Sequence, residues 1–353
     1  MPERKKYCHT VRLVVVCCVV VLCSACSSVE PILLRDQSVN LVWPQPPDPP
    51  RIKYLRDVKG PEDIYPEKNK FQKITEMVTG DNRLILELLT PYSVASNSKG
   101  VIYIADTTMG VVHRYDLVER DVSYIGRAGD EQLSSPVAVA LDLEDNLYIS
   151  DSVLNKVFKF KKDGEFVKEL TPPAGFKRPG GIAVNSAGEK FVVDALADIL
   201  HKFNANDLYE GEFPQRLPGE ELNTPSFVAT DRSGNVYVTD AMNFTVKKYS
   251  ADGKLMNRIG EVGDVPGTFA RPKGVALDSD GHVYVVDANH NNFQIFNGEG
   301  QLLLYVGSNG ERPGEFSLPS GIFIDNQDRI FVADTFNRRI QVFQYLRAGA
   351  KHE

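Results

Sequence analysis

Hydrophobic and polar positions repeat along this chain with a period of about 46 residues, as short apolar runs separated by turn residues. The clearest run has the form Val-Tyr-Val-Val-Asp and ends in an aspartate, here called the repeat aspartate. Six such aspartates occur, at intervals of 45, 43, 46, 47 and 47 residues: Asp106, Asp151, Asp194, Asp240, Asp287 and Asp334. Self-similarity at a fixed period of this length indicates a repeat architecture.

Other positions keep a fixed register to the repeat aspartate. In every unit an aromatic residue stands three residues before it, another stands nine residues after it, and the sixth residue after it is apolar. A proline opens each unit, from Pro91 to Pro319, and Gly, Asn and Asp residues mark most of the turns. Each unit therefore holds four short β segments, and a single four-stranded sheet cannot bury its own faces. Radial packing of six sheets solves this, which predicts an all-β, six-bladed β-propeller.

Three segments resemble the motifs of NHL repeats. They are Pro272-Lys273-Gly274-Val275-Ala276-Leu277-Asp278, Ile330-Phe331-Val332-Ala333-Asp334 and Asn337-Arg338-Arg339-Ile340-Gln341-Val342-Phe343. The resemblance covers residues 91–346 and implies the propeller of bacterial NHL-repeat proteins. A WD-type propeller is disfavoured, because one tryptophan cannot supply a Trp in each blade.

The first and last parts of residues 51–346 are expected to meet. The sixth unit ends at Tyr345-Leu346 after its third strand, and residues 51–60 look like the missing outer strand, so we expect them to close the ring and remove its exposed edge. Residues 61–90 form an insertion with helical spacing up to Gly80, in which the apolar residues are Phe71, Ile74, Met77 and Val78. A helix that covers the first blade is favoured over a partner-binding helix. Residues 347–353 are a tail.

Cysteine positions change the interpretation of the N-terminus. All five cysteines lie in the first 26 residues, where a basic leader precedes the apolar run Leu13–Cys23, which is too short to cross a bilayer. Residues 1–25 therefore predict a secretory signal peptide. Its end, Leu22-Cys23-Ser24-Ala25-Cys26, resembles a bacterial lipobox, which implies cleavage after Ala25 and a lipid on Cys26. The alternatives are an uncut anchor and simple secretion with cleavage nearby.

The lipobox resemblance also implies a location. Ser27 after the cysteine favours the outer membrane of a double-membrane cell envelope, with membrane attachment through the lipid. Residues 26–50, with five prolines between residues 44 and 50, predict a tether, which could extend to roughly 70 Å at about 3.1 Å per residue. Alternatively, the end of this segment packs on the propeller through Trp43.

Charge and residue types exclude several functions. A net charge of -7 disfavours nucleic acid as a partner, and a body without cysteine has no disulfide or thiolate metal site. Six repeat aspartates around a channel could hold a cation, but a residue present in every blade is better explained as an acceptor of hydrogen bonds from the turn that follows. We expect no metal and no cofactor.

The histidines do not indicate a zinc site. Zinc lyases among related propellers require converging histidines, whereas His113 and His201 stand seven residues after a repeat aspartate, in a register that we expect to be polar surface. His282 and His290 belong to opposite faces. The metal ligands of gluconolactonase-like propellers have no match here, and no catalytic nucleophile is evident.

Departures from the repeat are the candidates for function, because packing does not require them. They gather in the loops of one predicted face, around the channel mouth: Asn243, Phe244, Arg271, Asn289, His290, Asn291, Arg338 and Arg339. For each residue the alternative is a solvated loop. The favoured hypothesis is a lipid-anchored, non-catalytic scaffold for a protein or small ligand. The competing hypothesis is a metal-dependent envelope lyase or lactone hydrolase with its site at the channel mouth, so enzyme activity stays open but disfavoured.

Overall fold

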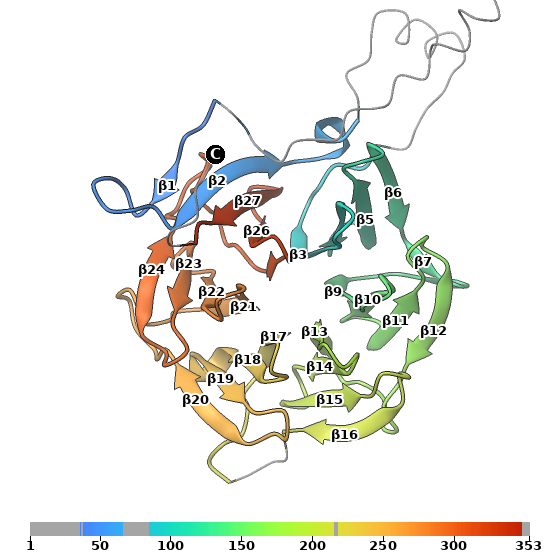
Figure 1. Cartoon of the computed structure of the whole chain (residues 1–353). Coiled ribbons are helices and arrows are strands. Elements are labelled where there is room, and N and C mark those ends of the chain that lie inside the picture. Colours follow the sequence, from blue (N-terminus) through green and yellow to red (C-terminus); the bar gives the residue numbers. More distant parts are fainter. Residues whose placement is uncertain (1–35, 37, 66–84, 215–217, 348–353) are drawn as a thin grey trace, which may run out of the picture.

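The six repeat units form six antiparallel sheets around a central axis, and Figure 1 shows them as the blades of a propeller. The computed structural model describes residues 36, 38–65, 85–214 and 218–347. The prediction of a six-bladed β-propeller is confirmed. Helical structure within the described residues is limited to two short 3₁₀ turns, η1 (Pro61–Asp63) and η2 (Ala241–Asn243).

Blades 1 to 5 each contain four strands in chain order from the axis outward. The strands are β3 (Pro91–Ser96), β4 (Val101–Asp106), β5 (Val111–Asp116) and β6 (Asp121–Ile125); β9 (Pro136–Leu141), β10 (Leu147–Asp151), β11 (Lys156–Phe160) and β12 (Phe166–Leu170); β13 (Pro179–Val184), β14 (Lys190–Asp194), β15 (Ile199–Phe203) and β16 (Tyr209–Phe213); β17 (Pro225–Thr230), β18 (Val236–Asp240), β19 (Thr245–Tyr249) and β20 (Leu255–Ile259); β21 (Pro272–Leu277), β22 (Val283–Asp287), β23 (Asn292–Phe296) and β24 (Leu302–Val306). A small hairpin, β7 (Arg127–Ala128) and β8 (Glu131–Gln132), lies between blades 1 and 2.

Blade 6 is built from both ends of the propeller. Its inner strands are β25 (Ile322–Ile324), β26 (Arg329–Asp334) and β27 (Arg339–Tyr345), and its fourth strand is β2 (Ile52–Val58). Strand β2 pairs antiparallel with β27 along its whole length, so the edge of β27 is covered (Figure 1). The segment expected to close the ring, residues 51–60, contains this strand.

A fifth strand extends blade 6 further outward. Strand β1 (Val42–Trp43) pairs with β2, and the Trp43 ring packs edge-on against Phe343 with 5.8 Å between ring centroids. The expected tether reached residue 50. Within that segment, however, Val39, Leu41 and Trp43 pack on the hydrophobic core at blade 6, as the alternative through Trp43 expected.

The positions that repeat in the sequence form the hydrophobic core of the propeller. All twelve aromatic residues at the two fixed positions, and all six apolar residues at the third, are at most 2% exposed. Such a blade buries its aromatic side chains against the neighbouring blade, which is why one motif recurs six times.

The chain path gives the propeller two unlike faces. Each inner strand begins where the second strand ends, as Pro91 pairs with Asp106. The second-to-third-strand turns and the loops between blades therefore share one face, here called the loop face. Its six turns are residues 107–110, 152–155, 195–198, 241–244, 288–291 and 335–338. The remaining turns form the opposite face.

Several predicted features lie outside the described residues. They are the signal peptide, its cleavage at Ala25, the lipid on Cys26 and the helix expected within residues 66–84. Within the described part of the chain, no helix has the length and apolarity needed to cross a membrane.

Candidate functional site

The repeat aspartates at the loop face are buried hydrogen-bond acceptors. The Asp106 carboxylate accepts bonds from Leu89 N at 2.7 Å, from Thr90 N at 3.2 Å and from Met109 N at 3.1 Å. Burial raises the pKa of Asp106, but the His113 ring 3.8 Å away and the hydrogen bonds from the backbone N–H groups outweigh burial and lower that pKa below its ordinary value. The expected bonds from the following turn are present, and the preceding inter-blade loop supplies the others.

The seventh residue after each repeat aspartate is buried in every blade, so the expectation of a polar surface register is wrong. These residues are at most 5% exposed: His113, Phe158, His201, Lys247, Gln294 and Gln341. The polar ones point beneath the inter-blade loop. Lys247 Nζ lies 2.8 Å from the Asp240 carboxylate and donates to the carbonyls of Glu220 and Glu221. They support the loop face from inside, which explains why they are polar yet buried.

The structure places all the predicted site residues except Arg339 on the loop-face surface. Asn243 and Phe244 end one turn, Asn289, His290 and Asn291 belong to the next, Arg338 ends the last, and Arg271 precedes β21. Arg339 begins β27 and is only 2% exposed, because it binds two carboxylates inside blade 6.

Three of these candidates make hydrogen bonds or ion pairs that hold the loops. Asn243 Nδ2 donates to Asp240 at 2.8 Å, and Asn291 Oδ1 accepts from Leu318 N at 2.9 Å. His290 Nδ1 lies 3.1 Å from the Asp287 carboxylate. Their polarity therefore follows from the fold and does not by itself indicate a ligand.

Two other candidates occupy a backbone conformation that their side chains do not favour. The fourth residue of every loop-face turn has a positive φ, which suits Gly110, Asn155, Asp198 and Asn291. Phe244 and Arg338 hold the same position, both with φ of 54°. Left-handed backbone costs such residues about 1 kcal/mol, and residues kept despite that cost mark places where the side chain is needed.

A feature that the sequence interpretation missed lies two residues after each repeat aspartate. This position is exposed in all six turns, and in four blades it carries a large apolar side chain. We call these four the apolar turn residues: Val153 (63% exposed), Leu196 (59%), Met242 (56%) and Phe336 (67%). The sequence signal that could have revealed them is a large apolar residue at a turn position where packing does not require one.

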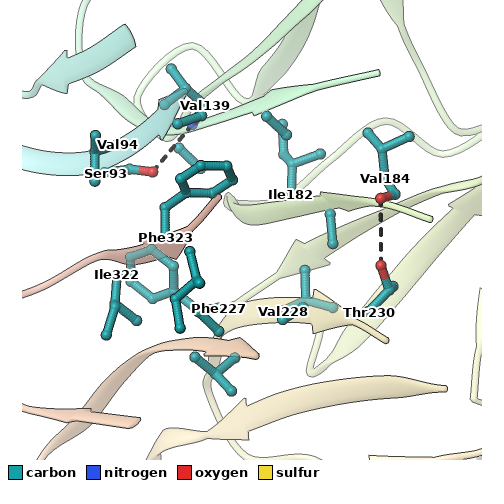
Figure 2. Close-up of a pocket in the computed structure, with 18 of the residues that line it drawn as sticks. Ser93, Val94, Val139, Ile182, Val184, Phe227, Val228, Thr230, Ile322 and Phe323 are labelled. Atoms are coloured by element: carbon teal, nitrogen blue, oxygen red, sulfur yellow. Dashed lines mark hydrogen bonds between the residues drawn. The ribbon is translucent and has the colours of Figure 1, made fainter. Parts of the chain in front are cut away.

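The cavity on the propeller axis has an uncharged side-chain lining. A cavity of about 190 Å³ lies between the inner strands, and no charged side chain lines it (Figure 2). Across the part of the chain that the structure describes, no group of three or more His, Cys, Asp or Glu residues could hold a metal ion.

Comparisons with known proteins identify the architecture. Residues 276–346 match the family model DUF5128, described as a 6-bladed beta-propeller. Among solved structures, a streptogramin B lyase is similar over 73% of this chain and 94% of its own, with 16% identity and a TM-score of 0.56. A virginiamycin B lyase from Staphylococcus aureus has 15% identity and a TM-score of 0.55 over 73% and 95% of the two chains.

An auxiliary nutrient binding protein from Bacteroides thetaiotaomicron is also similar, with 13% identity and a TM-score of 0.59 over 73% of this chain and 69% of its own. No curated protein matches the sequence. At these identities the likeness extends to fold alone, and lyases and binding proteins share that fold. The chain is therefore a six-bladed β-propeller, closed by strand β2.

Proposed function

We propose that this propeller is a non-catalytic scaffold of the cell envelope that binds a partner protein on its loop face. One observation carries the proposal: the four apolar turn residues stand more than half exposed at equivalent positions of one face. Exposed apolar side chains gathered on one face are characteristic of protein interaction sites. Met242 and Phe336 are of the types enriched in such interfaces.

Charge defines the partner further. Arg178, Arg271 and Arg338 are exposed on the same face, and none of them forms an ion pair with another described residue. Arginine beside apolar anchors favours a partner with apolar side chains flanked by carboxylates. The overall charge of -7 disfavours nucleic acid and an anionic membrane as the occupant.

A lipid on Cys26, after cleavage behind Ala25, would hold this face near a membrane. Asp36 stands only ten positions after Cys26, a span of at most about 36 Å. Asp36 lies beside Glu311 and Arg339, at the loop-face end of blade 6. We therefore expect the partner to be a protein in or on the same membrane, with the outer membrane favoured by Ser27.

The test places a photo-crosslinking amino acid at Met242 or at Phe336 in intact cells. Leu143 (78% exposed) and Leu208 (62%) are matched controls, because they are apolar residues in turns of the opposite face. We expect both loop-face positions to crosslink the same protein and the controls not to. A second variant, Leu196→Ser with Val153→Ser, should reduce that crosslink about tenfold by removing two apolar anchors.

Equal crosslinking from both faces would contradict the proposed surface. The lyase or hydrolase alternative has no set of metal ligands among the described residues. Stoichiometric zinc or calcium in the purified protein, lost together with an enzyme activity, would overturn the non-catalytic function itself.

A further inference from the structure

The cavity on the propeller axis is enclosed by the inner strands of all six blades. Counted from the proline that opens each unit, its walls are residues from the third to the sixth position, and Figure 2 shows Val139, Ile182 and Val228 around the open space with Phe227 and Phe323 at one side. Because the opening proline and the residue after it do not line the cavity in any unit, the cavity lies toward the opposite face.

Side chains from three blades narrow the loop-face end of the axis. Tyr92 of blade 1 reaches across and stacks on Phe227 of blade 4, with 5.8 Å between ring centroids and 24° between planes. Its hydroxyl accepts a hydrogen bond from Lys273 Nζ of blade 5 at 3.2 Å. The inner strands also approach closely there, since a Cβ on Gly321 would lie 2.6 Å from the Tyr92 carbonyl oxygen. Access is therefore from the opposite face.

The residues at that access are mostly apolar and partly exposed. Apolar Leu141, Val184 and Leu277 end three of the inner strands and Thr230 ends a fourth; each is of intermediate exposure, whereas the residues two positions earlier are buried. The cavity thus opens away from the apolar turn residues, and its occupant would not compete with a partner on the loop face.

The side chains that line the cavity indicate which ligands could occupy it. Two side-chain hydroxyls line the cavity, and both are already bonded to backbone: Ser93 Oγ accepts from Val139 N, and Thr230 Oγ1 donates to the Val184 carbonyl. A charged ligand would be desolvated without a counter-charge, which costs several kcal/mol. Each inner strand is the edge of its sheet, so unpaired backbone N–H and C=O groups face the axis and can bond one polar group of a ligand.

The volume of the cavity limits the size of the ligand. An engineered apolar cavity of about 150 Å³ in another protein stays dry and binds benzene, and the volume here is about 190 Å³. We propose that this central cavity, entered from the opposite face, binds a small uncharged molecule with an apolar body of one or two rings and at most one or two hydrogen-bonding groups.

The repeat supplies a substitution that fills the site. The fifth residue of the inner strand is alanine in five blades and Phe323 in the sixth. The fold therefore already accepts a phenylalanine at this register. Ala229 of blade 4 lines the cavity and is partly exposed, so Ala229→Phe should occupy the volume of the ligand with little strain.

The experiment measures binding of indole by saturation-transfer NMR on the whole mature protein. Benzoate has the same number of non-hydrogen atoms and is the charged counter-probe. We expect indole to saturate one site, Ala229→Phe to weaken it about tenfold or more with the unfolding temperature unchanged or raised, and benzoate not to bind. If Ala229→Phe fails to fold, Thr230→Leu, which narrows the entrance, should weaken binding in the same way.

Two outcomes would overturn the proposal: indole binding that neither variant changes, or benzoate binding as strong as indole binding. Met242→Ser separates this site from the proposed loop-face function. This variant should leave indole binding unchanged while it weakens the partner crosslink. The proposal for the cavity and the proposal for the loop face can therefore be refuted independently.

Discussion

At the scale of single residues, the loop face depends on buried polar groups that satisfy one another. The repeat aspartate is the same in every blade, but the side chain packed beneath it differs. Lys247 neutralises Asp240 at 2.8 Å, and Gln341 donates to Asp334 at 3.0 Å. A buried carboxylate needs hydrogen bonds from any available donor, so the requirement is conserved between blades while the residue is not.

A second buried cluster joins blades 2 and 3 at the opposite face. Asp207 receives Tyr148 OH at 2.8 Å, and the ammonium groups of Lys159, Lys168 and Lys190 lie within 3.0 Å of its carboxylate. Burial raises the pKa of Asp207, but the hydrogen bonds from the three lysines and Tyr148 outweigh it and hold that pKa well below its ordinary range. This carboxylate stabilises the blade contact in its charged form.

We predict that Asp207→Asn lowers the free energy of unfolding by about 3 kcal/mol at neutral pH, because it leaves buried Lys190 without its counter-charge. A carboxyl whose folded pKa is depressed contributes fully above its unfolded pKa and loses that contribution as the pH falls toward the folded pKa. The difference between wild type and variant should be constant above about pH 5 and narrow below about pH 4.

Urea unfolding across that pH range measures the difference. Asp163→Asn is the control, since Asp163 is exposed in the corresponding turn of blade 2 and should change stability by less than about 0.5 kcal/mol. A pH-independent gap for Asp207→Asn would refute the assigned cause.

At the scale of elements, Arg339 connects three parts of blade 6. Its guanidinium lies 2.7 Å from Asp334 at the end of β26 and 2.8 Å from Asp57 on the closing strand β2. The same group donates to the carbonyls of Arg312 and Glu315 in the inter-blade loop. A planar guanidinium with five donors suits such a junction better than an ammonium.

Arg339→Met should therefore lower the free energy of unfolding by about 3–5 kcal/mol, because Asp334 and Asp57 lose their shared cation. The adjacent Arg338→Met is the matched control, since Arg338 is exposed and makes no ion pair with another described residue. Thermal denaturation compares the two variants. Equal melting temperatures would show that Arg339 does not hold the closure.

At the scale of the whole molecule, closure by β2 makes the ring one cooperative unit. Ile52, Tyr54 and Val58 of this strand are at most 3% exposed and contact both blade 6 and its neighbours. Burial of three such side chains contributes about 5 kcal/mol or more. Without β2, the edge of β27 would be open to solvent and to other chains.

We predict that a protein starting at residue 59 melts at a clearly lower temperature than one starting at residue 36, still in a single transition. Both proteins lack the N-terminal segment, so the comparison isolates β1 and β2. Circular dichroism during heating measures the shift. If only part of the signal changed, with the remainder melting as before, the blades would be independent.

Much of this architecture can be derived from the chain. Twelve aromatic positions and six aspartates in a constant register require six equivalent sheets, because only a repeated packing environment imposes the same residue at the same spacing. The match between the end of the sixth unit and residues 51–60 points to the closing partner of β27 for the same reason. Residues 66–84 and the N-terminus keep their predicted helix and lipid as predictions.

The candidate site could be predicted from the sequence only in part. The departures from the repeat lie on one face, as the strand order requires, yet periodicity says nothing about exposure in a turn. Arg338 and Arg339 are adjacent and alike in sequence, but one lies on the surface and the other is buried between two carboxylates. Two other sets of residues show the same limit. The seventh residue after each repeat aspartate is mostly polar yet buried, and the apolar turn residues are exposed.

Local pattern thus specifies which residues pack within a blade, since strand pairing and side-chain alternation are short-range properties. Burial beneath an inter-blade loop, the joining of residue 57 to residue 339 and the narrowed end of the axis arise only when six blades meet, because the contacting groups come from distant parts of the chain. The binding face and the central cavity belong to that second level.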